Sequence, residues 1–350
     1  MRPRGTQPHR ANMPRFSSRF SARSLGFLVA AVALGLAVMT TGPSPVFGDA
    51  YTRVFINGTP VPVRFNDGDS FRVFGGEYRG SQCRLAGFNT LESFGPGHQW
   101  GDWHPYELYI NAKMATYNGR RGTWHCTTDG STDTYGRVLM ICPDLAVDQI
   151  RRGYAHAYQA DDTPSPPAYL RAQQEAIRNR RGMWAHGVPD YIMTSIHSAD
   201  EDPSREWHYN RLISVRDGHS ESMQHRETYE ECSWVCNEEI RVDVPRVTEA
   251  ARRLRADPEL APLLADFANL HLVEFVSRFH RIGELPEYLQ GPARPLVEQR
   301  IRAMQQAGEL GETRTERGSC MLHVPFERRY GRDRAECLRG HGDWGHGEGH

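Results

Sequence analysis

The sequence lacks an excess of charge of either sign and is almost devoid of lysine. It has 42 lysine and arginine residues against 43 aspartate and glutamate residues, and Lys113 is the only lysine. Residues 51–197 carry 15 basic and 14 acidic side chains, whereas residues 198–350 carry 21 and 28. A broad cationic surface of the kind that grips nucleic acid is therefore excluded. Any nucleic-acid binding must depend on a few local arginines.

Long apolar runs are also scarce, and the one exception lies near the N-terminus. Residues 1–48 contain six arginines and no acidic residue, and their apolar run from Leu25 to Met39 is followed by small residues up to Gly48. The run is shorter than the roughly 20 residues of a membrane-spanning helix. We therefore expect residues 1–48 to be a secretory signal peptide cleaved near Gly48. The mature protein would then be secreted or periplasmic, with no stable membrane association.

The seven cysteines lack the two-residue spacing of a zinc knuckle. In an exported chain this number suggests disulfides and one spare thiol. Cys126 and Cys142 flank a polar turn almost symmetrically and could form a cross-strand bridge, but Cys83 could compete for either partner. The other four cysteines allow three pairings, among which the sequence does not choose: Cys232, Cys236, Cys320 and Cys337.

Short runs of β-branched and aromatic residues, separated by turn residues, fill most of the first region. They predict strands over residues 54–56, 61–65, 71–74, 83–85, 123–127 and 138–142. Helical spacing of apolar residues predicts helices over residues 105–116, 145–152 and 167–184. Short strands with helices after them suit an α+β unit over residues 51–197, namely a five-stranded OB-fold β-barrel that carries helices.

The second region has helical apolar spacing, and it is acidic. The predicted helices are residues 247–255, 258–281 and 292–306. We expect residues 198–204 to be a linker, residues 205–339 to be a mainly helical, cysteine-containing domain, and residues 340–350, rich in Gly and His, to be a disordered tail. The acidity of this region favours a stabilising, inhibitory or protein-contact role over a grip on nucleic acid.

Three short motifs carry the chemistry, and they span Asp67 to Ser70, Arg84 to Glu92, and Asp133 to Arg137. The first two offer carboxylate and amide oxygens, which are the ligands that hard cations such as Ca²⁺ prefer. A glutamate in the second could activate or orient water. The second and third each supply an arginine, whose planar fork of donors fits phosphate oxygens. Together the motifs predict phosphodiester hydrolysis.

With these residues, the region 51–197 resembles the staphylococcal nuclease (thermonuclease) family. The resemblance implies the OB-fold barrel and a bound Ca²⁺. It also implies a role for each matching position: Asp69, Asn89 and the backbone carbonyl of Thr90 as metal ligands, Arg84 and Arg137 on the scissile phosphate, Glu92 as general base, and Tyr135 at the nucleotide site. Position 89 departs from the family, which has Asp there. We expect weaker calcium binding, because calcium affinity follows the charge of the ligands.

The resemblance implies an exported, calcium-dependent endonuclease that hydrolyses DNA and RNA with low sequence specificity and leaves 3′-phosphate ends. We expect a monomer, and a protein partner could contact the second region. A second hypothesis follows from Asn89 and from the acidic second region. In that hypothesis the protein is a catalytically impaired binding module for nucleic acid or protein.

Overall fold

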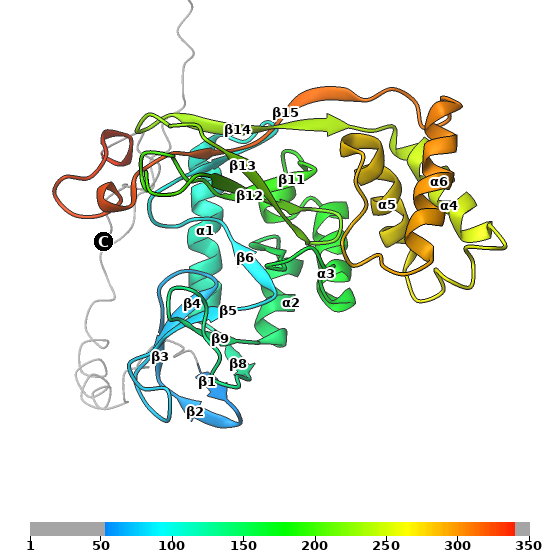
Figure 1. Ribbon diagram of the computed structural model, residues 1–350. Helices are drawn as coiled ribbons and strands as arrows, with labels where there is room; N and C mark the ends of the chain where they lie inside the picture. Colours follow the sequence, from blue (N-terminus) through cyan, green and yellow to red (C-terminus); the bar gives the residue numbers. More distant parts are fainter. Residues whose placement is uncertain (1–52, 340–350) are drawn as a thin grey trace, which may run out of the picture. The chain divides into compact units, whose positions relative to one another are not determined.

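A computed structural model describes residues 53–339 of the chain (Figure 1). The expected signal peptide, residues 1–48, and the expected tail, residues 340–350, lie outside the described residues. The described residues all belong to one compact unit. Within residues 53–339, no helix combines the length and the apolar character needed to cross a bilayer.

The described residues form an α+β structure with six α-helices and five small sheets, none of which closes into a barrel. The helices are α1 (Pro105–Gly119), α2 (Pro143–Arg151), α3 (Pro167–Arg178), α4 (Val244–Ala256), α5 (Asn269–Ile282) and α6 (Ala293–Gln306). The strands of the first region are β1 (Arg53–Ile56), β2 (Thr59–Val61), β3 (Val63–Phe65), β4 (Ser70–Val73), β5 (Gln82–Leu85), β6 (Phe88–Thr90), β7 (His98–Gln99), β8 (Thr123–Cys126), β9 (Val138–Met140) and β10 (Ala155–Ala157). The remaining strands are β11 (Tyr191–Ser195), β12 (His208–Ser214), β13 (Ser220–His225), β14 (Trp234–Arg241) and β15 (Arg314–Leu322).

The first region is built on a four-stranded and a three-stranded sheet, with strand orders β3-β4-β5-β9 and β2-β1-β8. Asn57 and Gly58 connect β1 to β2 with positive φ angles of 47° and 81°, as a two-residue hairpin turn of type I′ requires. Alternate residues of these strands point into one core, which includes Val54, Phe71 and Leu85. The strands expected in this region are present with shifts of a few residues at their ends, except that the expected strand 61–65 is divided between β2 and β3. The strands β6, β7 and β10 were not expected.

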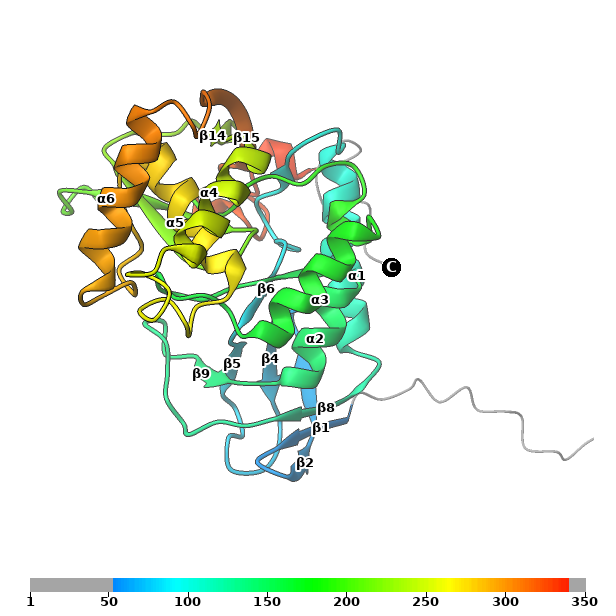
Figure 2. The ribbon, with the colours of Figure 1, turned by 90° about the vertical axis from the view of Figure 1, so that its right-hand side faces the viewer.

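Helices α1, α2 and α3 follow one another along the first region and lie side by side (Figure 2). Each begins at a proline, at Pro105, Pro143 and Pro167. Proline suits this position because the first turn of a helix needs no backbone N–H donor. The expected helix over residues 167–184 ends at Arg178, and a 3₁₀ turn at Gly182–Trp184 follows it.

The second region is not mainly helical, which corrects the expectation from its apolar spacing. Helices α4, α5 and α6 pack around their own core, but β12, β13, β14 and β15 belong to the same region. The sequence did not predict these strands because many of their residues are polar. The strand β13 reads Ser-Glu-Ser-Met-Gln-His and has no buried residue, so it shows no apolar alternation. The expected helix over 258–281 begins only at Asn269.

Strands from both regions share sheets. Residues 198–204, expected to be a linker, lie in the connection between β11 and β12, which are antiparallel neighbours in one sheet. The short strand β7 of the first region pairs with β15 near the end of the chain, with Gln99 opposite Cys320 and His98 opposite Met321. The two regions are therefore joined by backbone hydrogen bonds and not only by a covalent connection.

Three disulfides cross-link the chain, and the seventh cysteine forms no disulfide. The expected bridge between Cys126 and Cys142 is confirmed. The second region uses the pairings Cys232–Cys337 and Cys236–Cys320. Cys83 is the free, fully buried thiol. Such a disulfide content is compatible with an exported protein.

The cysteine arrangement predicts a thiol count. Burial raises the pKa of the Cys83 thiol to about 11, and the thiolate is the reactive form. Without reductant, the native protein should therefore react with no equivalent of a thiol reagent, and the protein unfolded in denaturant should react with one. The Cys83→Ala variant should give none in either state. Two or more reactive thiols in the unreduced, unfolded protein would contradict the pairing.

Candidate functional site

The candidate site lies where the turn before β4 meets β5 and β6. Asp69 directly precedes β4, and Ser70 is paired with Arg84 across the antiparallel β4–β5 ladder. The next strand, β6, carries Asn89 and Thr90. A side chain on the Gly68 backbone would clash, because an added Cβ would lie 2.6 Å from both Ala115 Cβ and Thr90 Cγ2. Glycine at position 68 thus lets the turn lie directly against α1 and β6.

Asp69 and Arg84 form a buried ion pair at the centre of the site. Asp69 is only 2% exposed, and its Oδ1 accepts a hydrogen bond from Arg84 Nη1. Its other oxygen, Oδ2, accepts from the backbone N–H of Thr90 at 2.6 Å and from the Thr90 hydroxyl at 2.9 Å. Burial alone would lower the pKa of Arg84, but the charges of Asp69 and Asp67 outweigh it and raise that pKa. Arg84 is therefore fixed in position and charged.

Asn89 takes the second donor group of the same guanidinium. Its Oδ1 accepts a hydrogen bond from Arg84 Nη2, and its Nδ2 donates to the carbonyl of Thr90 at 2.9 Å. The same Nδ2 lies 3.3 Å from Nε2 of the buried His156. Burial lowers the pKa of His156 to about 4, so at neutral pH its Nε2 accepts from the amide. His156 thus orients Asn89 so that the amide oxygen faces Arg84.

Glu92 lies on a loop that both regions of the chain hold in place. Its backbone N–H donates to Nε2 of His98, the first residue of β7, at 3.2 Å. Burial, followed by the neighbouring His156, lowers the pKa of His98 to about 3, so this ring remains neutral and accepting. The same loop is joined to β15, because Leu322 N–H donates to the Gly97 carbonyl at 3.0 Å.

The charges of several expected site residues shift the pKa of the Glu92 carboxyl. Burial raises its pKa, the charge of Asp69 raises it further, and the charges of Arg329, Arg84 and Arg137 oppose this rise. Arg329 comes from the far end of the chain and is the strongest of these opposing charges. It lies against the Glu92 loop, since a Cβ built on Gly95 would be 2.9 Å from Arg329 Cδ.

The side chain of Arg137 projects from the same face of the sheet as the side chain of Arg84. Strands β5 and β9 are parallel neighbours with Cys83 opposite Val138, and these two residues point into the core. Because side chains alternate along a strand, Arg84 and Arg137 both project from the other face. Arg137 Nε donates to Asp133 Oδ2 at 2.7 Å, which fixes its guanidinium.

Tyr135 lies in the turn just before Arg137. The carboxylate of Asp133 organises this turn by accepting from the backbone N–H groups of Tyr135 and Arg137, both at 2.9 Å. The Tyr135 side chain is 76% exposed, and its ring centroid is 5.5 Å from the Arg137 guanidinium carbon. Tyr135 is therefore open to a ligand that reaches Arg137.

The expected site residues thus occupy neighbouring elements, and one of them, Arg137, lines a cavity of about 330 Å³ whose walls also include Asp67, Ser70, Gln82, Phe94 and Tyr330. Asp69, Arg84, Asn89 and Thr90 are linked by hydrogen bonds, and Glu92 and Arg137 are electrostatically coupled to them. Tyr135 stands apart on the exposed turn.

Three residues of the site were not singled out from the sequence. Asp67 lies inside the first motif but appeared to be a turn residue. His156 is part of β10, where the apolar flanks Ala155 and Ala157 gave no sign of a polar contact. Arg329 is separated from Glu92 by more than two hundred residues of sequence, and no motif surrounds it. Only the fold brings His156 and Arg329 to the site.

The carboxyls of Asp67, Asp69 and Glu92 repel one another. Burial, and then the charge of Asp69, raise the pKa of Asp67 to about 7, and Glu92 adds to the effect. A divalent cation would relieve this mutual repulsion, and the donors are the hard oxygens that Ca²⁺ prefers. Asp69 Oδ1 and the Asn89 oxygen both face Arg84, so a cation there would compete with Arg84 for them. The oxygens present are of the kind that Ca²⁺ prefers, but those of Asp69 and Asn89 are already engaged by Arg84.

Within residues 53–339, the one group of His, Cys, Asp and Glu ligand atoms close enough together to hold a metal ion lies in the second region. Ligand atoms of His219, Glu221 and Glu274 all lie within 4.8 Å of one another. His219 Nε2 is 2.9 Å from Glu221 Oε1, and its Nδ1 is 2.6 Å from Asp217 Oδ1. Three arginines already form ion pairs with the two glutamates: Arg216, Arg278 and Arg281. Because these cations neutralise the carboxylates, we interpret the group as a charge network that holds α5 to β13.

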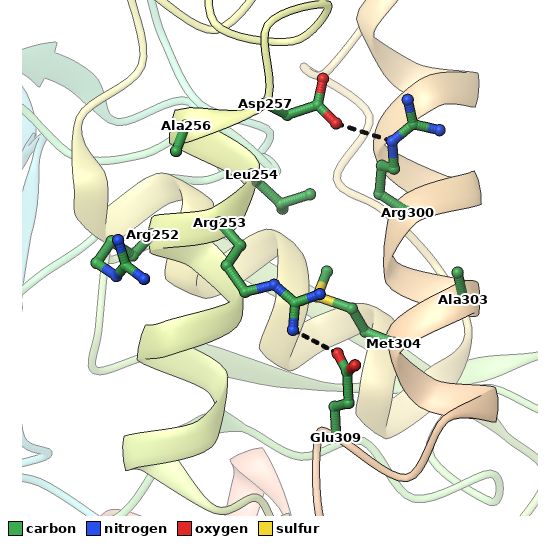
Figure 3. Close-up of a pocket in the computed structure, with 9 residues that line it drawn as sticks. All are labelled: Arg252, Arg253, Leu254, Ala256, Asp257, Arg300, Ala303, Met304 and Glu309. Carbon is green, nitrogen blue, oxygen red and sulfur yellow. Dashed lines mark hydrogen bonds and ion pairs between the residues drawn. The ribbon is translucent and has the colours of Figure 1, made fainter.

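A cavity of about 400 Å³ between α4 and α6 does not have the character of a catalytic site (Figure 3). Its charged side chains are already paired across the gap. Arg300 Nε lies 2.8 Å from Asp257 Oδ2, and Arg253 is paired with Glu309. These pairs connect the two helices, so the cavity reflects helix packing.

Comparisons with known proteins add no assignment. No protein-family model matches the sequence, and no curated protein matches it. The functional argument therefore depends on the residues and contacts described above.

The Asn89–His156 contact predicts the effect of restoring a carboxylate. In Asn89→Asp, no amide N–H remains to donate to His156 Nε2, and the added charge favours a protonated ring. The pKa of His156 should rise from about 4 by about 1–3. Histidine titration by NMR measures this change, and Asn89→Ala, which adds no charge, serves as the control. An unchanged pKa in Asn89→Asp would contradict the contact.

The Asn89→Asp variant should also change how the stability of the folded protein depends on pH. His156 titrates near 6.5 when unfolded and near 4 when folded, so the unfolded state takes up the proton first. The native protein therefore loses stability as the pH falls from about 6.5 to about 4. Asn89→Asp should make this loss smaller, as denaturant unfolding at pH 5 and pH 7.5 would measure.

Proposed function

We propose that this protein is an exported, calcium-dependent nuclease that hydrolyses phosphodiester bonds in DNA and RNA and leaves 3′-phosphate ends. One observation carries the proposal. Arg84 is held charged and immobile between Asp69 and Asn89, beside a cluster of carboxyls and on the same sheet face as Arg137. This combination of two phosphate-binding guanidiniums with hard oxygen ligands is what the reaction needs.

We propose further that residues 51–197 form a partly open OB-type fold. The two sheets β2-β1-β8 and β3-β4-β5-β9 support this interpretation, since their strands occur in short antiparallel runs closed by parallel pairs. OB-folds are partly open five-stranded barrels with ligand sites on the strands. The candidate site lies on β4, β5 and β6 and on the turn before β9, in keeping with that arrangement.

In the proposed reaction, the two arginines bind and orient the phosphate. Arg84 and Arg137 donate to its non-bridging oxygens and stabilise the negative charge that develops there as water attacks phosphorus. Calcium, held by Asp69 and neighbouring oxygens, would supply further charge stabilisation when bound. Because Asp69 and Asp133 hold the guanidiniums before substrate arrives, little reorganisation is required.

Glu92 takes the proton from the attacking water in this proposal. Because its pKa is raised, the Glu92 carboxylate is a stronger base than that of an ordinary glutamate. The water oxygen bonds to phosphorus, the bond from phosphorus to the 5′ oxygen breaks, and the departing 5′ oxygen takes a proton from solvent, to which Glu92 returns the proton it accepted. The products are a 3′-phosphate and a 5′-hydroxyl.

A binding module without turnover is the second candidate function. The observation that favours it is the competition at Asn89, where the amide oxygen is already occupied by Arg84. In that case nucleic acid or protein would be bound in the presence of a chelator, and no cleavage would follow.

Cleavage assays separate the two functions. Heat-denatured DNA and RNA should be degraded with calcium and remain intact with a chelator. Arg84→Ala and Arg137→Ala should each lower kcat about 10²–10³-fold, because each removes a preorganised donor to the transition state. Arg178→Ala, an exposed arginine in α3, is the matched control and should retain full activity. Absence of calcium-stimulated cleavage by folded protein would contradict the nuclease proposal and favour the binding module.

A further inference from the structure

A groove extends from the candidate site across the outer side of β3 and β4. The site cavity of about 330 Å³ adjoins a second cavity of about 390 Å³, because Asn66 and Phe94 line both. The second cavity is otherwise lined by Arg64, Phe65, Arg72, Phe74 and Arg120. The two cavities together, from Tyr330 to Phe74, are called here the arginine–aromatic groove.

The positions of the arginines in this groove are not explained by a contribution to the stability of the fold. Arg64 and Arg72 are exposed and lie directly opposite each other on the antiparallel strands β3 and β4. Like charges at such paired positions destabilise a sheet. Among the described residues, neither arginine forms an ion pair with a carboxylate. Arg120 stands near them with its guanidinium bonded to the Phe65 carbonyl at 2.7 Å. Three cations therefore line the second cavity, which no acidic residue of the described chain lines.

Exposed aromatic rings accompany these arginines. Phe74, Phe94 and Tyr330 are 51%, 39% and 50% exposed, respectively. The ring centroids of Phe94 and Tyr330 are 6.3 Å apart, and the Lys113 ammonium lies 4.3 Å from the Phe94 ring. Such exposed rings, spaced along a cationic groove, provide stacking surfaces for unpaired bases.

The second region of the chain supplies one end of the groove. Tyr330 follows Arg329, whose charge acts on Glu92, and the ring of Phe326 lies 6.4 Å from that of Tyr330. Two contacts hold this C-terminal segment in place, the Cys232–Cys337 disulfide and the ion pair between Arg328 and Glu231 at 2.8 Å. The segment is thus fixed beside the site by the fold of the second region.

We propose that the arginine–aromatic groove binds single-stranded nucleic acid and feeds it to the candidate site. The inference deepens the proposed nuclease function, on which it rests. Phosphates contact Arg64, Arg72 and Arg120, while unpaired bases stack on Phe94, Tyr330 and Phe74. A duplex would fit poorly, because its bases are already stacked and the near-neutral surface offers only these local cations.

Binding measured without turnover tests the groove. Fluorescence anisotropy of a labelled single-stranded oligonucleotide of roughly 12 nucleotides, in a chelator, gives Kd as a function of salt. We expect Arg64→Ala/Arg72→Ala to weaken binding at least tenfold at low salt. The slope of log K against log salt should decrease by about 0.7 for each phosphate that the variant no longer neutralises. Phe94→Ala and Tyr330→Ala should weaken binding with little change in this slope.

Matched controls separate the groove from general effects. Arg178→Ala and Tyr117→Ala remove an exposed arginine and an exposed aromatic residue outside the groove, and neither should alter binding. Single strands should bind more tightly than a duplex of the same sequence. Equal effects of the groove and control variants, or a preference for the duplex, would overturn the proposal.

A small chromogenic phosphodiester distinguishes failure of the groove from failure of the nuclease function. It reaches the catalytic residues without filling the groove, so Arg64→Ala/Arg72→Ala should cleave it at the wild-type rate while losing activity on single-stranded DNA. If the wild-type protein cleaves neither substrate but the groove variants still lose oligonucleotide binding, the groove proposal stands and the nuclease proposal fails. If the wild-type protein cleaves the small diester yet binds no single strand, the groove proposal is overturned.

Discussion

The buried contact between Asp69 and Arg84 is the interaction on which the site depends. Asp69 is buried and the Arg84 side chain is 17% exposed, so each charge is acceptable only because the other is present and because Thr90 and Asn89 supply hydrogen bonds. Removing one partner of such a pair typically costs about 3–5 kcal/mol, since an uncompensated charge is left buried. The contact also connects β4, β5 and β6, so the arginine that would bind phosphate is positioned by the same bonds that hold these strands together.

A second constraint connects the candidate site to the rest of the chain. The loop that carries Glu92 ends in β7, which is a strand of the sheet built by β14 and β15. Arg329, from beyond that sheet, returns to the loop and opposes the rise in the pKa of Glu92. The second region is therefore part of the environment of the site. Its acidic composition reflects its other surfaces, because the segment that reaches the site presents arginines and aromatic residues.

Local patterns in the sequence predicted what local physics determines. Prolines marked the starts of α1, α2 and α3, and the symmetric spacing of Cys126 and Cys142 about a turn pointed to their disulfide. The motif residues around Asp69 and Arg84 were found because each carries its chemistry in its residue type. The α+β class followed from the order of these elements.

Features that depend on long-range pairing could not be predicted in this way. The strand β13 has no buried residue, and the two buried residues of β14, Asn237 and Glu239, are polar, so neither strand shows an apolar alternation and both resemble loops in sequence. Nothing near Arg329 or His156 indicates their partners, which are far away along the chain. Asn89 appeared in the sequence to be only a weaker calcium ligand. Its amide also serves as the donor to a neutral histidine, which a carboxylate could not do without a proton.

Calcium titration by calorimetry tests the central claim most directly. The carboxyl cluster around Asp69 should bind Ca²⁺ at a single site, and Asp69→Asn should abolish that binding, whereas Glu221→Gln, in the separate His219 network, should leave it intact. Binding that is lost in Glu221→Gln and retained in Asp69→Asn, or no binding by the folded protein at millimolar calcium, would contradict the account.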